Sequence, residues 1–293
     1  MIPCYNQAKA VFSRGIICTS TLPTSKQVKI MAKSKTPEKV RTPPRRTSSS
    51  YKKKMNQIGS TSNPKNASNT ESTKSVDTTS TPWYNVFTKG DERYNAYMAN
   101  EWGYEKHGDQ ALFEKLCLEG AQSGLSWRTI LNKREAYRKA FHNFDIEKVA
   151  SMTSNDIDQI LNSGKTGDEM IVKHRGKIES VINNAKKLQD LLPVVKAEGY
   201  KDFSDWLWSF VNHQPVLNSW KSLSDMPSKT DESEAMSKAL KKNGFKFVGP
   251  TTCYSMMQSC GFVIDHPRDT KEWKASLDRL KKRKGGFQDR RDH

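Results

Sequence analysis

Apolar residues recur every three or four positions between residues 81 and 270, and only rarely at every second position. The clearest stripes are Ile178, Val181, Ile182, Ala185 and Leu188, followed by Phe203, Trp206, Leu207 and Phe210. This spacing places apolar side chains on one face of an α-helix, whereas a strand would alternate them. No alternating segment of useful length and no repeat is visible. The pattern therefore predicts an all-α domain over residues 81–270, which is long enough to enclose one hydrophobic core.

Glu119 interrupts one of these apolar stripes. On a helix through residues 112–120, the side chains of Leu112, Leu116 and Glu119 fall on the same face. An ionised carboxylate buried among apolar side chains is costly unless it has a specific partner, and burial raises its pKa. Two interpretations remain open: Glu119 is a buried functional carboxylate, or it lies near the helix end and reaches solvent.

Glycines flank a short segment between two predicted helices in the C-terminal part of this domain. Gly244 follows an amphipathic helix as a left-handed terminator would, and Pro250 suits the first turn of a second helix. Two helices joined in this way form a helix-hairpin-helix, whose hairpin amides and second helix N-terminus favour an anion such as phosphate. Lys242 and Lys246 would add positive charge. An ordinary turn between two helices is the alternative.

Five aromatic residues surround Glu119 in the sequence: Trp83, Tyr94, Tyr97, Trp102 and Trp127. Aromatic rings around a buried carboxylate suit a flat, electron-poor heterocycle, because such a ring stacks on their faces and is attracted to negative charge. The alternative is that these side chains belong to the ordinary hydrophobic core.

Charge is distributed unevenly along the 293 residues. The net charge is +17, of which residues 1–80 carry +12 and residues 271–293 carry +5, so residues 81–270 are neutral. We therefore expect two basic tails around a neutral body, acting as targeting signals or as nonspecific, salt-sensitive arms for a polyanionic partner. No apolar run approaches the roughly 18 residues of a membrane helix. Five scattered cysteines favour a reducing compartment over a disulfide scaffold.

Residues 1–80 are expected to be disordered, because residues 34–81 consist mostly of Ser, Thr, Lys, Asn and Pro. The first 37 residues contain no acid, as in organelle transit peptides, and Met31 could serve as an internal start that omits most of them. The basic clusters within residues 41–46 and 52–54 instead resemble a nuclear localisation signal. The nucleus and an organelle (mitochondrion or plastid) are therefore competing destinations.

With these features together, the body resembles the DNA-3-methyladenine glycosylase I family, the constitutive bacterial type among the helix-hairpin-helix DNA glycosylases. The matching segments follow one another across residues 83–266, nearly the whole body. They are Asn100-Glu101-Trp102-Gly103, Leu112-Phe113-Glu114, Cys117-Leu118-Glu119-Gly120, Ser123-Gly124-Leu125-Ser126-Trp127, His174-Arg175-Gly176-Lys177-Ile178, Trp208-Ser209-Phe210-Val211-Asn212-His213-Gln214-Pro215 and the stretch from Lys238 to Gly261.

The resemblance implies a monofunctional enzyme that excises 3-methyladenine from alkylated double-stranded DNA in base excision repair. Glu119 would then read the edge of the flipped adenine and stabilise positive charge, with Tyr97 as its hydrogen-bonding neighbour. The walls on which the base stacks would be Trp83, Tyr94, Trp102 and Trp127. No cofactor and no obligate protein partner are expected, and we expect a monomer.

The same resemblance assigns the contacts with the DNA strand. Leu125 would insert into the gap that the flipped base leaves. The hairpin would grip backbone phosphates through Lys242, Gly244, Lys246 and Gly249.

One departure from the family concerns a structural zinc ion, which many members hold with two Cys and two His. Alignment with the family places Thr81, Met98 and Thr270 at three of those positions, and His266 alone retains a ligand. One ligand of four cannot hold structural zinc. We therefore expect no metal, and we expect packing to join the terminal segments instead.

Two other functions remain open. A helix-hairpin-helix protein could bind DNA or a damaged base without cleaving it, although such a protein could lose Glu119, Tyr97 and Trp127 freely. A broader-range alkyl-base glycosylase would need a catalytic aspartate, for which Asp265, directly before His266, is the candidate.

Overall fold

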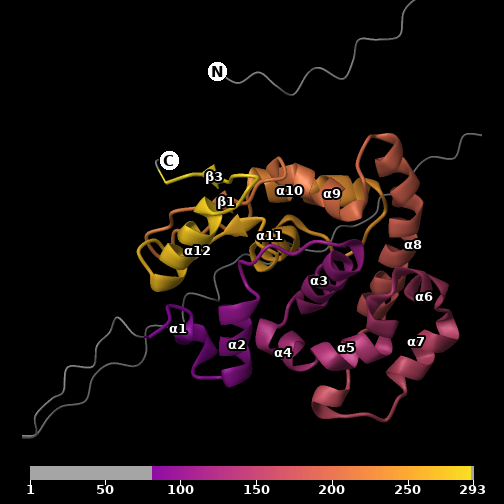
Figure 1. The fold of residues 1–293 in the computed structure, drawn as a ribbon. Helices are drawn as coiled ribbons and strands as arrows, with labels where there is room; N and C mark the ends of the chain where they lie inside the picture. Colours follow the sequence, from indigo (N-terminus) through magenta and orange to yellow (C-terminus); the bar gives the residue numbers. More distant parts are fainter. Residues whose placement is uncertain (1–80, 292–293) are drawn as a thin grey trace, which may run out of the picture. The chain divides into compact units, whose positions relative to one another are not determined.

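The computed structural model describes residues 81–291, and the predicted disordered tail over residues 1–80 lies outside this range. Figure 1 shows that the described chain is mostly helical. The first helices are α1 (Asn85–Thr88), α2 (Glu92–Asn100), α3 (Asp109–Gln122), α4 (Trp127–Asn132), α5 (Arg134–Ala140), α6 (Ile146–Ser151) and α7 (Ser154–Leu161). The later ones are α8 (Arg175–Ala197), α9 (Phe203–Trp208), α10 (Asp231–Lys242), α11 (Pro250–Ser259) and α12 (Lys271–Lys281). Short 3-10 turns are η1 (His142–Phe144), η2 (Gly167–Glu169) and η3 (Ser209–Val211). The predicted all-α fold class is confirmed.

A small parallel sheet was not expected from the sequence. Its central strand β1 (Val216–Leu217) pairs with β2 (Val263–Ile264) on one side and with β3 (Gln288–Asp289) on the other. Strands of two residues are too short to leave an alternating pattern, so the periodicity of the sequence could not reveal them. The sheet joins three segments that are far apart in the chain.

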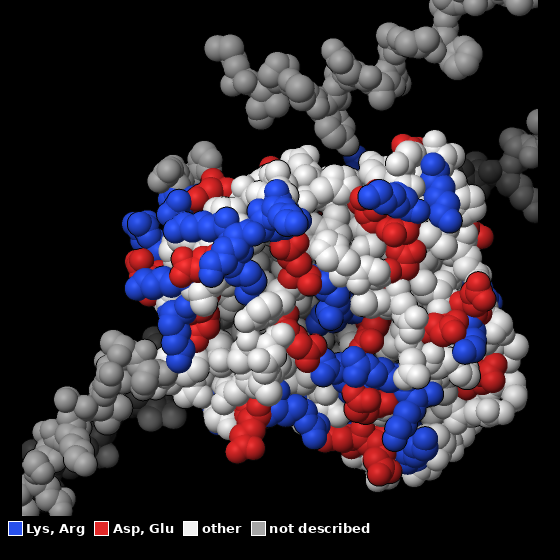
Figure 2. Space-filling model, in the orientation of Figure 1, with Lys and Arg blue, Asp and Glu red and all other residues white. Residues whose placement is uncertain are grey.

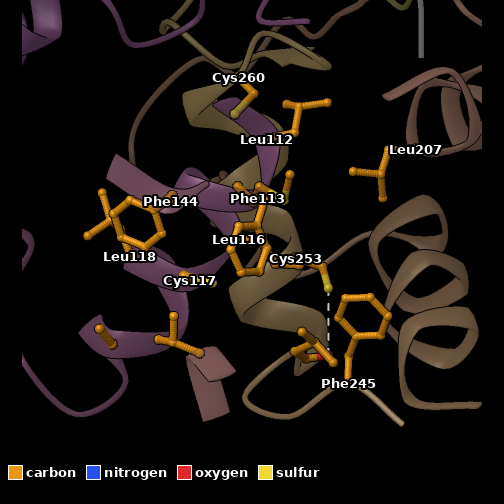
Figure 3. Close-up of a cluster of buried hydrophobic side chains, with 14 of the residues drawn as sticks. Leu112, Phe113, Leu116, Cys117, Leu118, Phe144, Leu207, Phe245, Cys253 and Cys260 are labelled. Atoms are coloured by element: carbon orange, nitrogen blue, oxygen red, sulfur yellow. Dashed lines mark hydrogen bonds between the residues drawn. The ribbon is translucent and has the colours of Figure 1, made fainter. Parts of the chain in front are cut away.

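Helix α3 lies at the centre of the core. Leu112, Phe113, Leu116 and Leu118 are each at most 1% exposed, and α3 packs against α11, α8 and α4. Figure 3 shows these side chains beside Leu207, Phe245 and Cys253, which come from later parts of the chain. Close packing on several sides holds this helix rigidly. Any side chain that α3 presents to a cavity is therefore firmly positioned.

The two predicted apolar stripes are buried as expected. On α8, all five members from Ile178 to Leu188 are buried. On α9 the side chains of Phe203, Trp206 and Leu207 are buried, and Phe210 in the following η3 turn is half-buried. Helix α8 is the longest helix of the described chain, at 23 residues. It packs along α6, and it also contacts α3 and α9.

The prediction of a basic C-terminal tail over residues 271–293 is wrong for the described part of that segment. Trp273, Leu277 and Leu280 on α12 are buried against Leu217 and Ile264 of the small sheet. Their helical spacing was visible in the sequence, but the net charge of the segment dominated its interpretation. Figure 2 shows Lys and Arg side chains gathered over the region of α12 and β3, so the positive charge lies on the outer face of a folded element.

Hydrogen bonds and ion pairs join the N-terminal segment of the described chain to its C-terminal segment. Trp83 Nε1 donates to His266 Nδ1 at 3.0 Å. Arg279 on α12 donates to the carbonyl oxygen of Gly103 at 2.7 Å, and its guanidinium lies 4.1 Å from the centre of the Tyr104 ring. These contacts, with a further ion pair between Arg283 and Glu105, join the two terminal segments of the described chain without a metal ligand set.

The buried His266 should make the folded chain less stable as the pH falls below about 6.5. Burial, reinforced by the charge of Arg279, lowers the pKa of His266 from 6.5 to about 3. The unfolded chain therefore binds a proton below about pH 6.5, whereas the folded chain binds it only near pH 3. We expect His266 to remove about 2 kcal/mol from the free energy of unfolding between pH 7 and pH 5.

Urea unfolding of wild type and His266→Gln at both pH values measures this effect, because the glutamine can still accept from Trp83 but does not titrate. The variant should lose stability less steeply with falling pH. Equal slopes would contradict a buried, neutral His266.

Candidate active site

Glu119 faces a cavity of about 200 Å³ that lies between α2, α3, α4 and α11. Aromatic side chains form much of its wall. All six residues predicted to form a base pocket line this cavity: Trp83, Tyr94, Tyr97, Trp102, Glu119 and Trp127. Met98, Gln122, Gln258 and Ser259 are also among the lining residues. The structure therefore brings together side chains that are spread over 45 positions in the sequence, from Trp83 to Trp127.

The aromatic rings contact one another in a continuous series. The ring centres of Tyr97 and Trp127 are 5.3 Å apart, and those of Tyr94 and Tyr97 are 6.3 Å apart. Trp83 packs edge-on against Trp102 at 5.8 Å. Rings held in this way need little reorganisation to receive a flat ligand.

Glu119 itself is buried, with 5% of its surface exposed, although it lies in the last turn of α3. The pKa of its carboxyl group is raised, because the effect of burial exceeds the opposite effects of the Lys115 ammonium and the Ser259 hydroxyl. The interpretation that Glu119 escapes to solvent is therefore wrong. Burial and the nearby carboxylate raise the pKa of Tyr94 to about 12, and they raise that of Tyr97 well above its usual range. Both phenols are thus neutral near pH 7.

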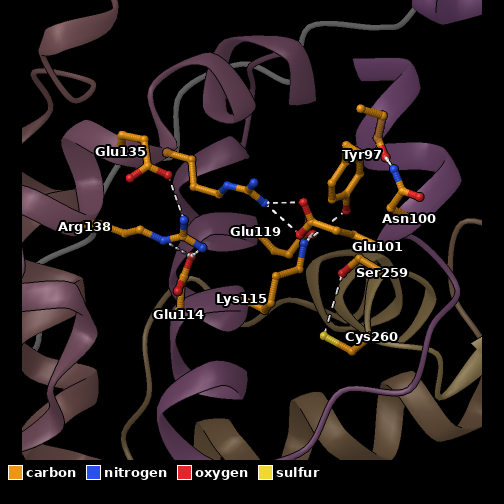
Figure 4. Close-up of polar contacts among 12 residues, drawn as sticks. Tyr97, Asn100, Glu101, Glu114, Lys115, Glu119, Glu135, Arg138, Ser259 and Cys260 are labelled. Atoms are coloured by element: carbon orange, nitrogen blue, oxygen red, sulfur yellow. Dashed lines mark hydrogen bonds and ion pairs between the residues drawn. The ribbon is translucent and has the colours of Figure 1, made fainter. Parts of the chain in front are cut away.

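Lys115 was missed in the sequence, and it changes the expected contact between Tyr97 and Glu119. Its ammonium nitrogen Nζ donates to the phenol oxygen of Tyr97 at 3.0 Å and lies 3.6 Å from Glu119 Oε1 (Figure 4). The predicted hydrogen-bonding neighbours are thus linked through a lysine. The signal available in the sequence was the spacing of four between Lys115 and Glu119, which places both side chains on one helix face.

Leu125 lies in the turn between α3 and α4. Its side chain is 40% exposed, and Gly124 before it adopts a φ of +77°. Ser126 caps α4 by accepting from Thr129 N at 3.2 Å. The turn is also held from α8, because Lys177 Nζ donates to the carbonyl oxygens of Ala121 and Ser123, both at 2.7 Å. An exposed leucine on a firmly anchored turn has the geometry of a wedge.

The predicted helix-hairpin-helix is present. Gly244 adopts a φ of +81° directly after α10, and Pro250 occupies the first turn of α11. Lys242 and Lys246 are exposed on this hairpin, as is Gly244, while Gly249 is half-buried. Phe247 within the hairpin also has a positive φ, of +55°, and is 37% exposed.

Two asparagines on α8 hold the hairpin in place. Buried Asn184 accepts from Lys246 N at 2.8 Å and donates to Lys246 O at 3.0 Å. Asn183 donates to Gly244 O at 2.9 Å in an exposed position. These bonds fix the backbone of the hairpin, and backbone amides can bind an anion only when they point outward together.

The hairpin also contacts α3 directly beside the pocket. A Cβ atom added to Gly120 would lie 3.2 Å from both Cβ and the carbonyl oxygen of Phe247. Glycine at position 120 therefore permits a close approach between the hairpin and the residue that follows Glu119. The hairpin is thereby held directly beside the end of α3 that carries Glu119.

Asn184→Ala should weaken binding to undamaged duplex DNA about tenfold, because it leaves two partly buried backbone groups of Lys246 without their Asn184 partner and loosens the hairpin. Fluorescence anisotropy with a labelled duplex at fixed salt concentration measures the effect. Asn183→Ala is the matched control and should cost much less, since its bond to Gly244 O is exposed and its second bond, to Asn184 Oδ1, is not one of the two bonds that hold Lys246. Equal losses in both variants would contradict the assignment of Asn184 as the main clamp.

Asp265 does not have the surroundings of a catalytic acid. It is fully buried and accepts from Asn218 Nδ2 at 2.7 Å, Trp220 Nε1 at 2.8 Å, Tyr254 Oη at 2.6 Å and Gln258 Nε2 at 2.9 Å. It is not among the residues that line the cavity. Four donors occupy its oxygens, so its role here is structural. The broader-range glycosylase, which needed this aspartate as its acid, is not supported.

The residues at the family's zinc positions do not fit a metal. His266 Nδ1 accepts the hydrogen bond from Trp83, so this nitrogen is already used. Thr81, Met98 and Thr270 offer neither a thiolate nor an imidazole, and Thr270 caps α12 instead by accepting from Trp273 N. Within residues 81–291 no group of three or more His, Cys, Asp or Glu side chains is placed to hold an ion. We expect elemental analysis of the purified protein to find zinc well below one equivalent, and stoichiometric zinc would overturn this prediction.

No helix in the described range is both long and apolar enough to cross a membrane.

The family model and the similar proteins and structures described below are all methyladenine glycosylases. The family model for methyladenine glycosylase matches residues 87–272. The chain is 48% identical over 194 residues to the DNA-3-methyladenine glycosylase of Haemophilus influenzae, covering 66% of this chain and 96% of that protein. It is also 48% identical over 176 residues to DNA-3-methyladenine glycosylase 1 of Escherichia coli, covering 60% and 89%. A solved structure of 3-methyladenine DNA glycosylase I from Staphylococcus aureus, which concerns 3-methyladenine recognition, superimposes with a TM-score of 0.57 at 37% identity, covering 62% of this chain and 92% of that one.

Proposed function

This chain belongs to the methyladenine glycosylase family, and from that premise we propose how its own residues carry out excision. It is a DNA glycosylase that removes 3-methyladenine from alkylated DNA by hydrolysing the N-glycosidic bond, a step of base excision repair. The observation that carries the proposal is a single buried carboxylate, that of Glu119, set in an aromatic cavity beside an exposed leucine turn and a helix-hairpin-helix.

Base recognition follows from the charge of the lesion. Methylation at N3 gives adenine in DNA a positive charge, and a flat cation fits between aromatic rings that face an anionic oxygen. Glu119 would accept hydrogen bonds from the edge of the adenine ring. Tyr97, a neutral phenol in the same wall, would donate or accept beside it, and Trp127 would supply a stacking face. Unmethylated adenine lacks the charge and would bind less tightly.

Bond cleavage needs little help from an acid, because the cationic base is already a good leaving group. As the bond between C1′ and N9 breaks, its electron pair passes to the base, which leaves as neutral 3-methyladenine. Water then adds to C1′ and loses a proton, which leaves an abasic site. The positive charge moves from the base to the sugar during this step, and a fixed carboxylate stabilises it throughout.

Two surface features would bring the base to the pocket. Leu125 would fill the gap in the stack after flipping, which otherwise costs a few kcal/mol of lost stacking. The hairpin, with Lys242 and Lys246 beside its backbone amides, would bind phosphates of the same strand. Residues 81–270 are neutral overall, so recognition would depend on these contacts rather than on bulk charge.

No lyase step is proposed. Among the described residues, no lysine lines the cavity, and Lys115 lies behind its wall with its ammonium group engaged by Tyr97. An amine that cannot reach C1′ cannot form a Schiff base there.

Release of free base from methylated duplex DNA tests the function. Incubation with N-methylated DNA, followed by chromatography of the supernatant, should show 3-methyladenine and leave abasic sites. Binding of this DNA without any release would support the alternative of a non-catalytic binding protein. A profile of several released bases in similar amounts would support a broad-range enzyme.

The cellular address and the oligomeric state are further proposals. We propose that residues 1–80 direct the enzyme to the nucleus or to an organelle, supported by their net charge of +12, and that the enzyme acts as a monomer. A fluorescent fusion of residues 1–80 distinguishes the two destinations, and a diffuse cytosolic signal would exclude both. Light scattering of the purified chain tests the monomer.

A further inference from the structure

Lys115 is a buried lysine directly behind the base pocket. It lies on α3 one turn before Glu119, and 4% of its surface is exposed. Its Nζ atom lies 4.4 Å from the centre of the Trp127 ring and 4.9 Å from that of Tyr97. The same atom donates to the Tyr97 phenol and is paired with Glu119. One ammonium group thus contacts three side chains that line the cavity.

A lysine in this position has no packing advantage over an apolar residue of similar length. Taking an ammonium group out of water is expensive, and the ion pair with one carboxylate does not normally repay that cost in stability. Lys115 is not itself among the lining residues, so it does not touch a bound base. Whatever it contributes passes through Glu119, Tyr97 and Trp127.

We propose that Lys115 is a positioning residue of the base pocket. It pairs with the Glu119 carboxylate so that this group meets the cationic base as an anion, and it fixes the phenol oxygen of Tyr97. The inference rests on the proposed excision of 3-methyladenine and adds to it a residue that acts from behind the wall.

The hydrogen-bond donors and acceptors support this assignment. An ammonium group can only donate, so the Tyr97 oxygen accepts from it and the phenol proton remains available for another acceptor. The ammonium group also makes a cation–π contact with the indole ring of Trp127. The three lining side chains are thereby held relative to one another without blocking the cavity.

Polar and titratable groups from α2, α3 and α11 surround Glu119, and among the described residues only one of them is charged. On α2, Tyr94 and Tyr97 are neutral because their pKa values are raised. Ser259, the last residue of α11, carries no charge, and Cys260 directly after it is neutral since burial raises its pKa to about 11. The positive charge that acts on Glu119 comes from Lys115 on its own helix. Without Lys115, burial would raise the pKa of Glu119 with less opposition, and more of the enzyme would carry a neutral carboxyl group at a given pH.

Three substitutions separate charge from hydrogen bonding. Lys115→Met removes both, Lys115→Gln keeps a donor for Tyr97 without the charge, and Lys115→Arg keeps the charge. Single-turnover excision from methylated duplex DNA is measured across pH, after circular dichroism and thermal unfolding have shown that each variant is folded. In Met and Gln variants we expect the acid limb of the profile to move up by about one pH unit or more. In the Arg variant it should remain near its wild-type position.

A direct titration keeps the test independent of catalysis. ¹³C NMR of protein labelled at the glutamate carboxyl carbons follows Glu119, whose signal is identified by its loss in Glu119→Gln. Its midpoint should rise in Lys115→Gln and stay in place in Lys115→Arg. In a Glu119→Gln background, Lys115→Met should no longer change the pH profile.

The outcomes are distinct. Wild-type protein that releases no base contradicts the excision function, while the NMR titration still decides the role of Lys115. Normal wild-type excision with the same Glu119 midpoint in all variants overturns the proposal for Lys115 alone. A loss of activity that is equal at every pH and is not rescued by arginine would show that Lys115 is merely structural. If Lys115→Met does not fold, the Gln and Arg variants decide.

Discussion

Glu119→Gln should reduce single-turnover excision of 3-methyladenine by about 100-fold to 1000-fold. The amide retains the shape of the side chain and can still accept a hydrogen bond, but it carries no charge to meet the cationic base and the developing cation on the sugar. Removing one preorganised electrostatic group from a buried site typically costs this much. The measurement is the rate of base release at saturating enzyme, so that weaker DNA binding does not contribute.

Binding of the duplex itself should change little in this variant, because the hairpin and the Leu125 turn are intact. Glu114→Gln is the matched control: it lies on the same helix but pairs with Arg138 at 2.8 Å, and it is not among the residues that line the cavity. Its excision rate should stay close to that of wild type. A folded Glu119→Gln enzyme that releases base at the wild-type rate would refute the assigned role.

Local sequence signals were sufficient to predict the helices and the hairpin. Gly244 and Pro250 each occupy the terminus that was predicted for them, because backbone restrictions at glycine and proline act within a few residues. Glu119 could be singled out since its helical position was fixed by the neighbouring leucines. Its burial, however, depends on α2 and α11, which only the three-dimensional packing places beside it.

The structure added what depends on long-range contacts. Lysine is usually exposed, so the spacing between Lys115 and Glu119 alone does not indicate a buried ion pair. The hydrogen bond between Trp83 and His266 spans 183 positions, and no local pattern indicates it. For α12 the opposite applies: the apolar spacing of Trp273, Leu277 and Leu280 was present, and the charge of the segment outweighed it in our interpretation.

These findings place the recognition machinery on one rigid element. Helix α3 carries Lys115, Glu119 and Gly120, so it contributes to the back of the pocket, its carboxylate and the seat of the hairpin at Phe247. Lys177 on α8 fixes the C-terminal end of α3, from which the Leu125 turn departs. In the proposed mechanism, phosphate binding, insertion of Leu125 and recognition of the flipped base would therefore be coupled through the position of one helix rather than through flexible loops.

Trp127→Ala should lower excision about 10-fold to 100-fold at 3-methyladenine sites, the range expected when one base loses its aromatic stacking partner. The loss acts on binding of the flipped base, so we expect it mainly as weaker affinity for methylated DNA and for free 3-methyladenine. Tyr97, whose ring centre is 5.3 Å away, would remain as a less complete wall. Titration of free 3-methyladenine by calorimetry, together with excision rates, measures both effects.

The control for this prediction must separate stacking from packing, because Trp127 is 9% exposed and also belongs to the core. Truncation of a buried aromatic residue costs about 3–5 kcal/mol of stability, so rates are to be measured well below the unfolding temperature of the variant. Trp127→Phe retains a ring face and should stay within about tenfold of wild type. The indole nitrogen of Trp127 is buried without a hydrogen-bond partner, so the phenylalanine removes no bond within the protein. If the Phe variant loses as much activity as the Ala variant while both remain folded, stacking is not the contribution of Trp127, and its indole N–H becomes the group that contacts the base.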